Sequence, residues 1–184
     1  EFFAGKSAQD LSLVEPGFFE RTGFDLRLAA RAASVDRRAR TVTTADGEQL
    51  PYDVLVLATG SVPFVPPIAG RERPNCFVYR TIDDLEAMQA ASAKARRGVV
   101  VGGGLLGLEC AKALRDLGLE THVVEFAPRL MAVQVDESGG RILREKIEAL
   151  GVHVHTRRST TQITDGAEHR HRMVFEDEIG RAHV

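Results

Sequence analysis

Cysteine is scarce in this chain of 184 residues, which contains only Cys76 and Cys110. Two cysteines exclude a disulfide framework and a four-cysteine zinc site, so we expect reduced thiols and a cytoplasmic protein. No apolar run approaches the ~20 residues that a membrane-spanning helix needs. The 24 basic and 26 acidic residues give a net charge of −2. This balance argues against a nucleic-acid partner and a membrane partner, because both need clustered positive charge.

The two ends of the chain also lack features that complete proteins usually show. The sequence begins at Glu1, without an initiator methionine or a signal sequence. Residues 177–184 include the string EIGRAHV, which is typical of the translation of a sequencing adapter. We interpret this segment as a non-native tail rather than a genuine polar one. We therefore expect an internal fragment of a larger protein.

A stretch rich in proline divides the chain. Residues 62–76 contain four prolines, and proline at this density cannot hold a helix or a central strand. Before it, Val54–Leu57 is an uninterrupted apolar run, which predicts a strand buried on both faces of a parallel sheet. We place a domain boundary near residue 80, with 1–80 as part of one domain and 81–176 as most of another.

Beyond this boundary the sequence alternates between strand and helix patterns. Thr81 followed by Asp84 resembles a capping box with Asp in place of Glu, which predicts a helix start. Short apolar runs predict three strands, and apolar residues at helical spacing predict two helices between them. This β-α-β-α-β order indicates an α/β fold of Rossmann type with a parallel sheet. The segments are 99–101, 108–117, 121–126, 136–150 and 152–155, and weaker strand patterns follow at 159–176.

A glycine-rich turn connects the first of these strands to the first helix. Its residues satisfy the G-x-G-x-x-G pattern in the strand–turn–helix context that the pattern requires. We expect the first glycine to permit a sharp turn, the second to let a pyrophosphate approach, and the third to let the helix pack closely on the strand. The helix N-terminus would offer N–H donors to the phosphates. A structural turn without a ligand is the alternative. The residues are Gly102, Gly103, Gly104, Leu105, Leu106 and Gly107.

An acidic residue ends the second strand of the pattern. Glu125 stands 18 residues after Gly107, close to the ~20 at which an acid binds the ribose hydroxyls of a dinucleotide. Its charge would repel the 2′-phosphate of NADP, whereas Arg129 could pair with that phosphate, and we favour NADH over NADPH. A solvated carboxylate is the alternative for Glu125. Glu109, in the first turn after the glycines, either stabilises the helix dipole or faces the nicotinamide.

Several segments of the sequence resemble those of a known protein family. Residues 52–61 (YDVLVLATGS) resemble the segment that crosses the flavin domain of pyridine-nucleotide-dependent flavoprotein reductases. Residues 102–109 and 124–130 resemble the NADH-binding domain inserted into it. The resemblance covers residues 1–176. Within this family, the sequence resembles the large subunits of assimilatory NAD(P)H-dependent nitrite reductases, through residues 11–14, 77–82, 101–109 and 120–128.

The resemblance implies that a hydride passes from NADH to FAD. The flavin would then supply iron–sulfur and sirohaem centres, where nitrite is reduced. The resemblance also implies that Thr59 and Gly60 lie against the FAD, that Arg80 is near the junction of the two cofactors, and that Glu109 lies near the nicotinamide. The iron–sulfur and sirohaem centres would lie in C-terminal domains or a small subunit. The glycine fingerprint for FAD would precede Glu1, and the segment that closes the flavin site would follow Glu176. We expect this fragment to be inactive alone.

Two other functions remain open from the sequence. One is a rubredoxin- or ferredoxin-type reductase that passes electrons to a separate redox protein. The other is a non-catalytic module that senses NADH and signals through a change of shape. Residues beyond 176 would distinguish a separate reductase from a nitrite reductase, since only a nitrite reductase continues into cluster and sirohaem ligands. Bound flavin in the longer protein would count against the second.

The remaining cysteine and histidine residues suggest ordinary structural roles. Cys110 lies on the helix face that packs against the sheet, and we interpret it as a small buried hydrophobe rather than a redox thiol. His153 and His155 share one face of a strand. A metal would need a third ligand, which is not apparent in the sequence, so we expect no metal site.

Overall fold

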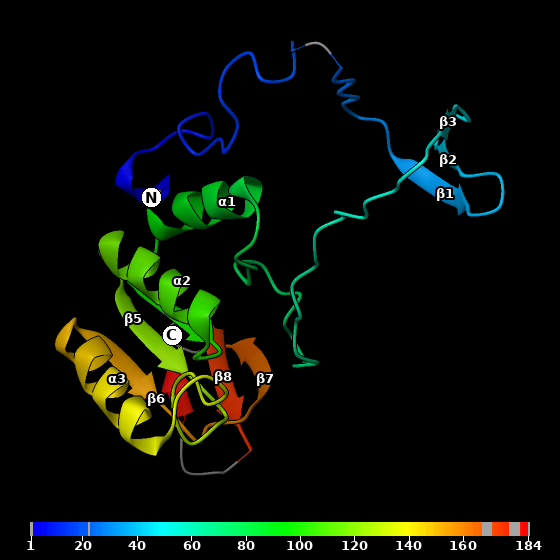
Figure 1. Cartoon of the computed structure of the whole chain (residues 1–184). Coiled ribbons are helices and arrows are strands. Elements are labelled where there is room, and N and C mark those ends of the chain that lie inside the picture. The colour runs from blue at the N-terminus through cyan, green and yellow to red at the C-terminus, as the bar shows by residue number, and fades with distance from the viewer. Residues whose placement is uncertain (1, 22, 167–170, 177–180, 184) are drawn as a thin grey trace. The chain divides into compact units, whose positions relative to one another are not determined.

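The computed structural model describes residues 2–21, 23–166, 171–176 and 181–183 (Figure 1). Backbone contacts divide the chain into two compact units. The smaller unit spans Ser12–Ser61, and the larger one joins Glu1–Leu11 to Val62–Val184. This division falls at residue 62 rather than near residue 80. The assignment of residues 1–80 and 81–176 to two cofactor-binding domains stays a prediction.

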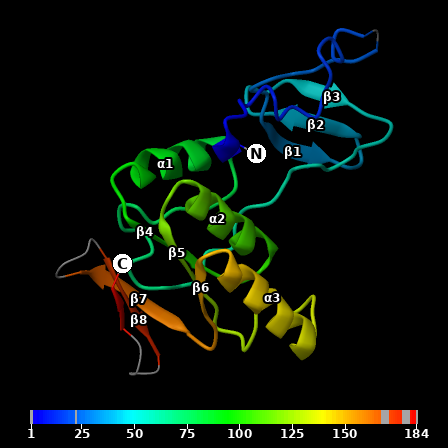
Figure 2. The same ribbon diagram turned by 90° about the vertical axis from the view of Figure 1, so that its left-hand side faces the viewer.

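A parallel sheet forms the centre of the larger unit (Figure 2). It contains β4 (Arg97–Val101), β5 (Glu120–Val124) and β6 (Val152–His155), in the order β4-β5-β6. Both strand pairs are parallel, as β-α-β connections require. The connecting helices are α2 (Leu105–Asp116) and α3 (Glu137–Ala149). The predicted Rossmann-type arrangement is therefore confirmed.

The main hydrophobic core lies between the sheet and its helices. Val100, Val123 and Val154 come from alternate strand positions and share one face of the sheet. Leu114 of α2 packs in the same cluster, and Leu143 of α3 packs against it. Both helices therefore cover the same face. The opposite face carries the other alternate positions of the three strands.

Helix α1 (Ile82–Ser92) begins at the predicted capping box. The backbone N–H of Asp84 donates to the Thr81 hydroxyl at 3.2 Å, and the N–H of Thr81 donates to the Asp84 carboxylate at 2.7 Å. Both hydrogen bonds of the capping box therefore form with Asp in place of Glu. The 3₁₀ helix η1 (Phe2–Ala4) contacts α1, and Phe3 packs against the main core.

An antiparallel sheet covers part of the second face of the parallel sheet. Its strands are β7 (Thr160–Asp165), β8 (His171–Phe175) and β9 (Arg181–His183). Met173 and Phe175 of β8 pack with Val124 of β5 in a second buried cluster. The strand patterns seen at 159–176 are thus confirmed for 160–165 and 171–175, and residues 167–170 lie outside the described residues. Of the predicted non-native tail, residues 177–180 and 184 lie outside the described residues.

The proline-rich stretch belongs to the larger unit. Ala69 forms a bridge to Gln162, and the N–H of Ile163 donates to the Ala69 carbonyl at 2.8 Å. Arg73 forms an ion pair with Asp165 of β7. These contacts dock the stretch on β7 and explain why the division between the units precedes it.

The smaller unit contains an antiparallel sheet of β1 (Ala32–Asp36), β2 (Thr41–Thr44) and β3 (Gln49–Pro51). The buried strand predicted at Val54–Leu57 is wrong for this structure. The segment is irregular, and the side chain of Val54 is 83% exposed. A central strand forms only when neighbouring strands satisfy its backbone on both sides, and no described strand pairs with this segment. Among the described residues, no helix is long and apolar enough to cross a membrane.

Candidate nucleotide-binding site

The glycine turn has the tight geometry that its sequence predicts. Gly102 adopts φ +113°, which L side chains rarely adopt, and its N–H donates to the carbonyl of Val124 at 2.8 Å. A Cβ atom on Gly107 would lie only 2.0 Å from the carbonyl oxygen of Gly102. The first and third glycines are therefore required by the fold itself, because they allow the turn and the close approach of α2 to β4.

The second glycine has a different setting. Gly104 is the N-cap of α2, and no side chain caps the helix there. A Cβ on Gly104 would meet no atom within 4 Å, and its φ of −83° suits any residue. Leu105 and Leu106 are exposed in the first turn of the helix. An uncapped helix N-terminus with open space in front of it has the features of a phosphate-binding site.

Glu125 follows β5 directly and is only 8% exposed. Its Oε2 accepts a hydrogen bond from the N–H of Gly103 at 2.6 Å, and its Oε1 accepts one from the N–H of Ala127 at 2.7 Å. A carboxylate has about four acceptor positions, so two remain for further donors such as ribose hydroxyls. The sequence places Glu125 near the turn but does not show that its carboxylate also holds the turn in place.

The loop between β5 and α3 closes over the glycine turn. The N–H of Met131 donates to the carbonyl of Gly103 at 2.9 Å. Leu130 is fully buried, and its side chain would lie 2.5 Å from a Cβ on Gly103. The sequence does not single out Leu130, because Phe126, Met131 and Val133 in the same loop are apolar too.

Arg129 is committed to the same loop. Its Nε donates to the carbonyl of Val135 and one terminal nitrogen donates to the carbonyl of Ala132, both at 3.0 Å. The aliphatic part of its side chain lies against Gly140 of α3. Pairing with a 2′-phosphate would compete with these two hydrogen bonds. The structure therefore supports a role for Arg129 in stabilising this loop.

The other predicted site residues are spread over the two units. Glu109 is exposed on α2, two residues after Gly107, and Arg80 is exposed directly before the cap of α1. Thr59 and Gly60 belong to the smaller unit, where both are exposed in an irregular segment. The structure thus brings the glycine turn and Glu125 together, and Arg129 lies in the loop that closes over the turn. Around Thr59 and Gly60 the structure shows no comparable set of buried hydrogen-bonding groups.

Cys110 lies one position after Glu109 and is buried. Burial raises the pKa of its thiol to about 11, so at neutral pH the group is a neutral thiol with little nucleophilic character. The predicted burial of Cys110 is confirmed. Burial also raises the pKa of the nearby Tyr79 hydroxyl, and the carboxylate of Glu109 raises it further.

Comparison with known proteins gives the same picture. The profile of a family described as pyridine nucleotide-disulphide oxidoreductases matches residues 5–181. A nitrite reductase [NAD(P)H] large subunit from Klebsiella oxytoca is 62% identical over 163 residues, which are 89% of this chain and 17% of that protein. The nitrite reductase (NADH) large subunit of Escherichia coli is 49% identical over 177 residues, which are 96% of this chain and 21% of that protein. This chain therefore spans about a fifth of the length of these curated relatives.

Solved structures share the fold. A ferredoxin reductase from Rhodopseudomonas palustris is 28% identical and has a TM-score of 0.88. The similarity covers 99% of this chain and 45% of that one. The similarity therefore includes nearly the whole of this chain but less than half of the reductase.

Proposed function

The chain belongs to the pyridine nucleotide-disulphide oxidoreductase family, and from this we propose that residues 102–129 form the NADH-binding site of a flavoprotein reductase. Members of the family bind FAD and NAD(P)H. The observation that carries the proposal is the hydrogen bond from Gly103 to Glu125. It brings a buried carboxylate against the turn that precedes an uncapped helix N-terminus. One group suits ribose hydroxyls and the other suits phosphates.

The residues of this site would bind and orient the nucleotide. The N–H groups at the start of α2 would donate to the pyrophosphate, and Gly104 would leave room for it. Glu125 would accept hydrogen bonds from the adenosine ribose through its two remaining acceptor positions. We keep NADH as the preferred nucleotide, because the Glu125 charge disfavours a 2′-phosphate and Arg129 is engaged with the loop carbonyls. When bound, the nicotinamide supplies a hydride to FAD.

The proposed whole protein is an assimilatory nitrite reductase in the cytoplasm. Support comes from the identity to two nitrite reductase large subunits. In this proposal Thr59, Gly60 and Arg80 lie on the flavin side and Glu109 lies towards the nicotinamide. The proposed partners of this chain are the other domains or the small subunit of the same enzyme. Those parts would hold the iron–sulfur and sirohaem centres and complete the FAD site.

A second candidate is a ferredoxin-type reductase, which the similarity to the Rhodopseudomonas palustris enzyme favours. The two functions differ in where the electrons go. The longer protein that contains this chain should oxidise NADH when nitrite is added if it is a nitrite reductase. It should need an added ferredoxin or rubredoxin if it is a separate reductase. NADH binding without any bound flavin would instead support a sensing module.

The nucleotide site can be tested on this chain by calorimetric titration with NADH and, separately, with NADPH. We expect tighter binding of NADH. Glu125→Gln should reduce the difference by ~1–3 kcal/mol, the scale of a charge-assisted hydrogen bond. Glu137→Gln is the matched control, since Glu137 is an exposed carboxylate on α3. Failure of a folded chain to bind either nucleotide would contradict the proposal, and tighter binding of NADPH would reverse the preference.

A further inference from the structure

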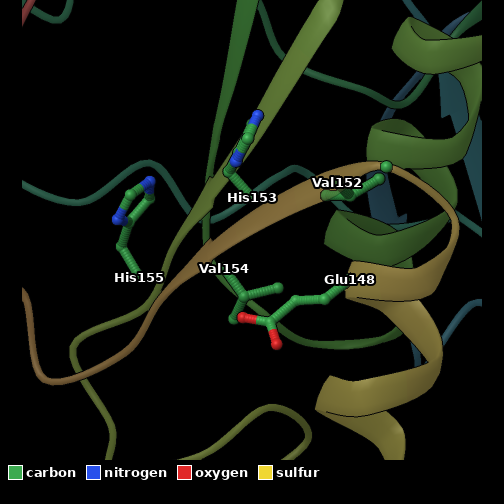
Figure 3. Close-up of a pocket in the computed structure, with 6 residues that line it drawn as sticks. Glu148, Val152, His153, Val154 and His155 are labelled. Atoms are coloured by element: carbon green, nitrogen blue, oxygen red, sulfur yellow. The ribbon is translucent and has the colours of Figure 1, made fainter.

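Three histidines gather on the face of the parallel sheet that the helices do not cover. His122 lies on β5, and its register partner on β6 is His153. His155 lies two residues further along β6 and therefore on the same side of that strand. In Figure 3, His153 and His155 project to one side of β6 while Val154 points to the other. Beside β6 lies a cavity of about 270 Å³ that both histidines help to line.

Glu120 joins this group from the start of β5. One of its oxygens, Oε1, lies 3.2 Å from Nε2 of His122. The potential ligand atoms of Glu120, His122 and His153 all lie within 4.8 Å of one another. In a tetrahedral zinc site with bonds of ~2.0–2.1 Å, ligand atoms are ~3.3 Å apart. The rings of His122 and His153 are stacked with centroids 4.6 Å apart. Convergence of the ligand atoms on one ion therefore requires rotation of Glu120 and His153, which are both exposed.

The neighbours of these groups hold them in position. Nδ1 of His122 lies 3.1 Å from Nε2 of His155. When His122 carries its proton on Nδ1 and donates it to His155, the Nε2 lone pair of His122 is free and faces Glu120. The second oxygen of Glu120 accepts a hydrogen bond from Nε of Arg97 at 2.8 Å. Partners of this kind are what orient the ligands in established metal sites.

We propose that Glu120, His122 and His153 form a binding site for a divalent transition-metal ion of the zinc type. Two imidazoles and one carboxylate match the donor set of zinc sites that keep a fourth position for water. Imidazole nitrogen favours zinc, copper, nickel or iron over calcium and magnesium, which prefer oxygen ligands. In this arrangement His155 is a positioning residue. It orients His122 and does not contact the ion.

The proposed site is separate from the nucleotide site. His122 lies in the middle of β5, whereas Glu125 follows its carboxyl end, so the two are about 10 Å apart along the strand. Val124 and β8 occupy the sheet face between them. The metal ion would therefore not displace a bound nucleotide, and the proposal does not depend on the function proposed above.

The test is a titration of the full chain with Co²⁺, followed by competition with Zn²⁺. We expect one equivalent of Co²⁺ to give the visible absorption of a nitrogen- and oxygen-bound ion, and Zn²⁺ to remove it. His153→Gln and Glu120→Gln should each weaken binding by at least ~10-fold. Both residues are exposed, and circular dichroism shows whether the fold is retained. His171→Gln is the control, because its Nε2 lies 2.7 Å from the Pro74 carbonyl and outside the cluster.

His155→Gln separates the positioning role from a direct one. We expect lower affinity with the Co²⁺ spectrum retained. A changed spectrum would show that His155 itself binds the ion and would overturn its assignment. Absence of the Co²⁺ absorption, or binding that His153→Gln leaves intact while His171→Gln weakens it, would overturn the site as a whole. In that case the histidines form only a stacked polar cluster.

Discussion

The carboxylate of Glu125 and the backbone N–H of Gly103 are joined by a hydrogen bond of 2.6 Å in a buried setting. The bond connects the end of β5 to the turn after β4, so one side chain fixes both the strand end and the glycine turn. A ligand that binds the helix N-terminus and Glu125 together would meet groups already in place. Preorganisation of this kind lowers the entropic cost of binding.

Gly104 and Gly107, the second and third glycines of the motif, should respond differently to substitution by alanine. Gly104→Ala should lower the free energy of unfolding by no more than ~1 kcal/mol, because its Cβ meets open space and the only cost is that alanine is a poorer N-cap than glycine. It should abolish nucleotide binding if the pyrophosphate lies there. Gly107→Ala should destabilise the fold, because its Cβ would lie 2.0 Å from the Gly102 carbonyl oxygen. Urea unfolding and NADH titration of both variants check this, and unchanged NADH binding by Gly104→Ala would contradict the assignment.

Removal of the Glu125 side chain should also weaken the fold. Glu125→Ala leaves the N–H groups of Gly103 and Ala127 without their acceptor in a buried place. We expect a loss of ~1–3 kcal/mol in the free energy of unfolding, measured by urea unfolding without nucleotide. Glu137→Ala, on the exposed surface, is the control and should change it by no more than ~0.5 kcal/mol. Equal effects of the two substitutions would show that the Glu125 bonds contribute little.

The capping box of α1 predicts a smaller and more local effect. Thr81→Ala removes the acceptor for the Asp84 N–H and should cost ~0.5–2 kcal/mol of stability. Thr81→Ser keeps the hydroxyl and should stay close to the original chain. Amide hydrogen exchange in the first turn of α1 should rise only in the alanine variant. Faster exchange throughout the chain would indicate that α1 is a part of the global unfolding unit.

The two cysteines should differ in reactivity. At pH 8 a thiol reagent should modify Cys76 faster than Cys110, because Cys110 is buried and its pKa is raised to about 11. Since the pKa in the folded chain lies above the ordinary value of 9.0, the stability due to the neutral thiol is complete below pH 9 and falls as pH rises towards 11. Cys110→Ala should remove this decrease in stability above pH 9. Rapid modification of Cys110 in the folded chain would contradict its burial.

The apolar segment at Val54–Leu57 predicts association. Its exposed side chains form an apolar surface of the kind that binds dyes or other chains. Val56→Asp should reduce dye binding and self-association without lowering the free energy of unfolding, because the side chain is exposed. Val123→Asp, in the buried core of the larger unit, is the contrast and should unfold that unit. A loss of stability with Val56→Asp would show that the segment is packed in solution.

The sequence by itself determined the parallel sheet, the cap of α1 and the glycine turn. These features follow from local patterns: apolar periodicity sets the elements, short connections of fixed hand set their order, and a tight turn requires glycine at particular positions. Glu125 was found for the same reason, since its place directly after a strand puts it at the edge where the turn lies.

The tertiary structure decided what depends on residues far apart in the chain. His153 and His155 have no visible third partner in the sequence, and only the register of β5 against β6 places His122 opposite His153. The run at Val54–Leu57 has the composition of a central strand, yet a strand also needs neighbours to satisfy its backbone. Arg129 carries a charge suited to a phosphate, but its distances to loop carbonyls decide which acceptors it meets. Local sequence sets what each segment can form, and packing between segments sets which groups meet.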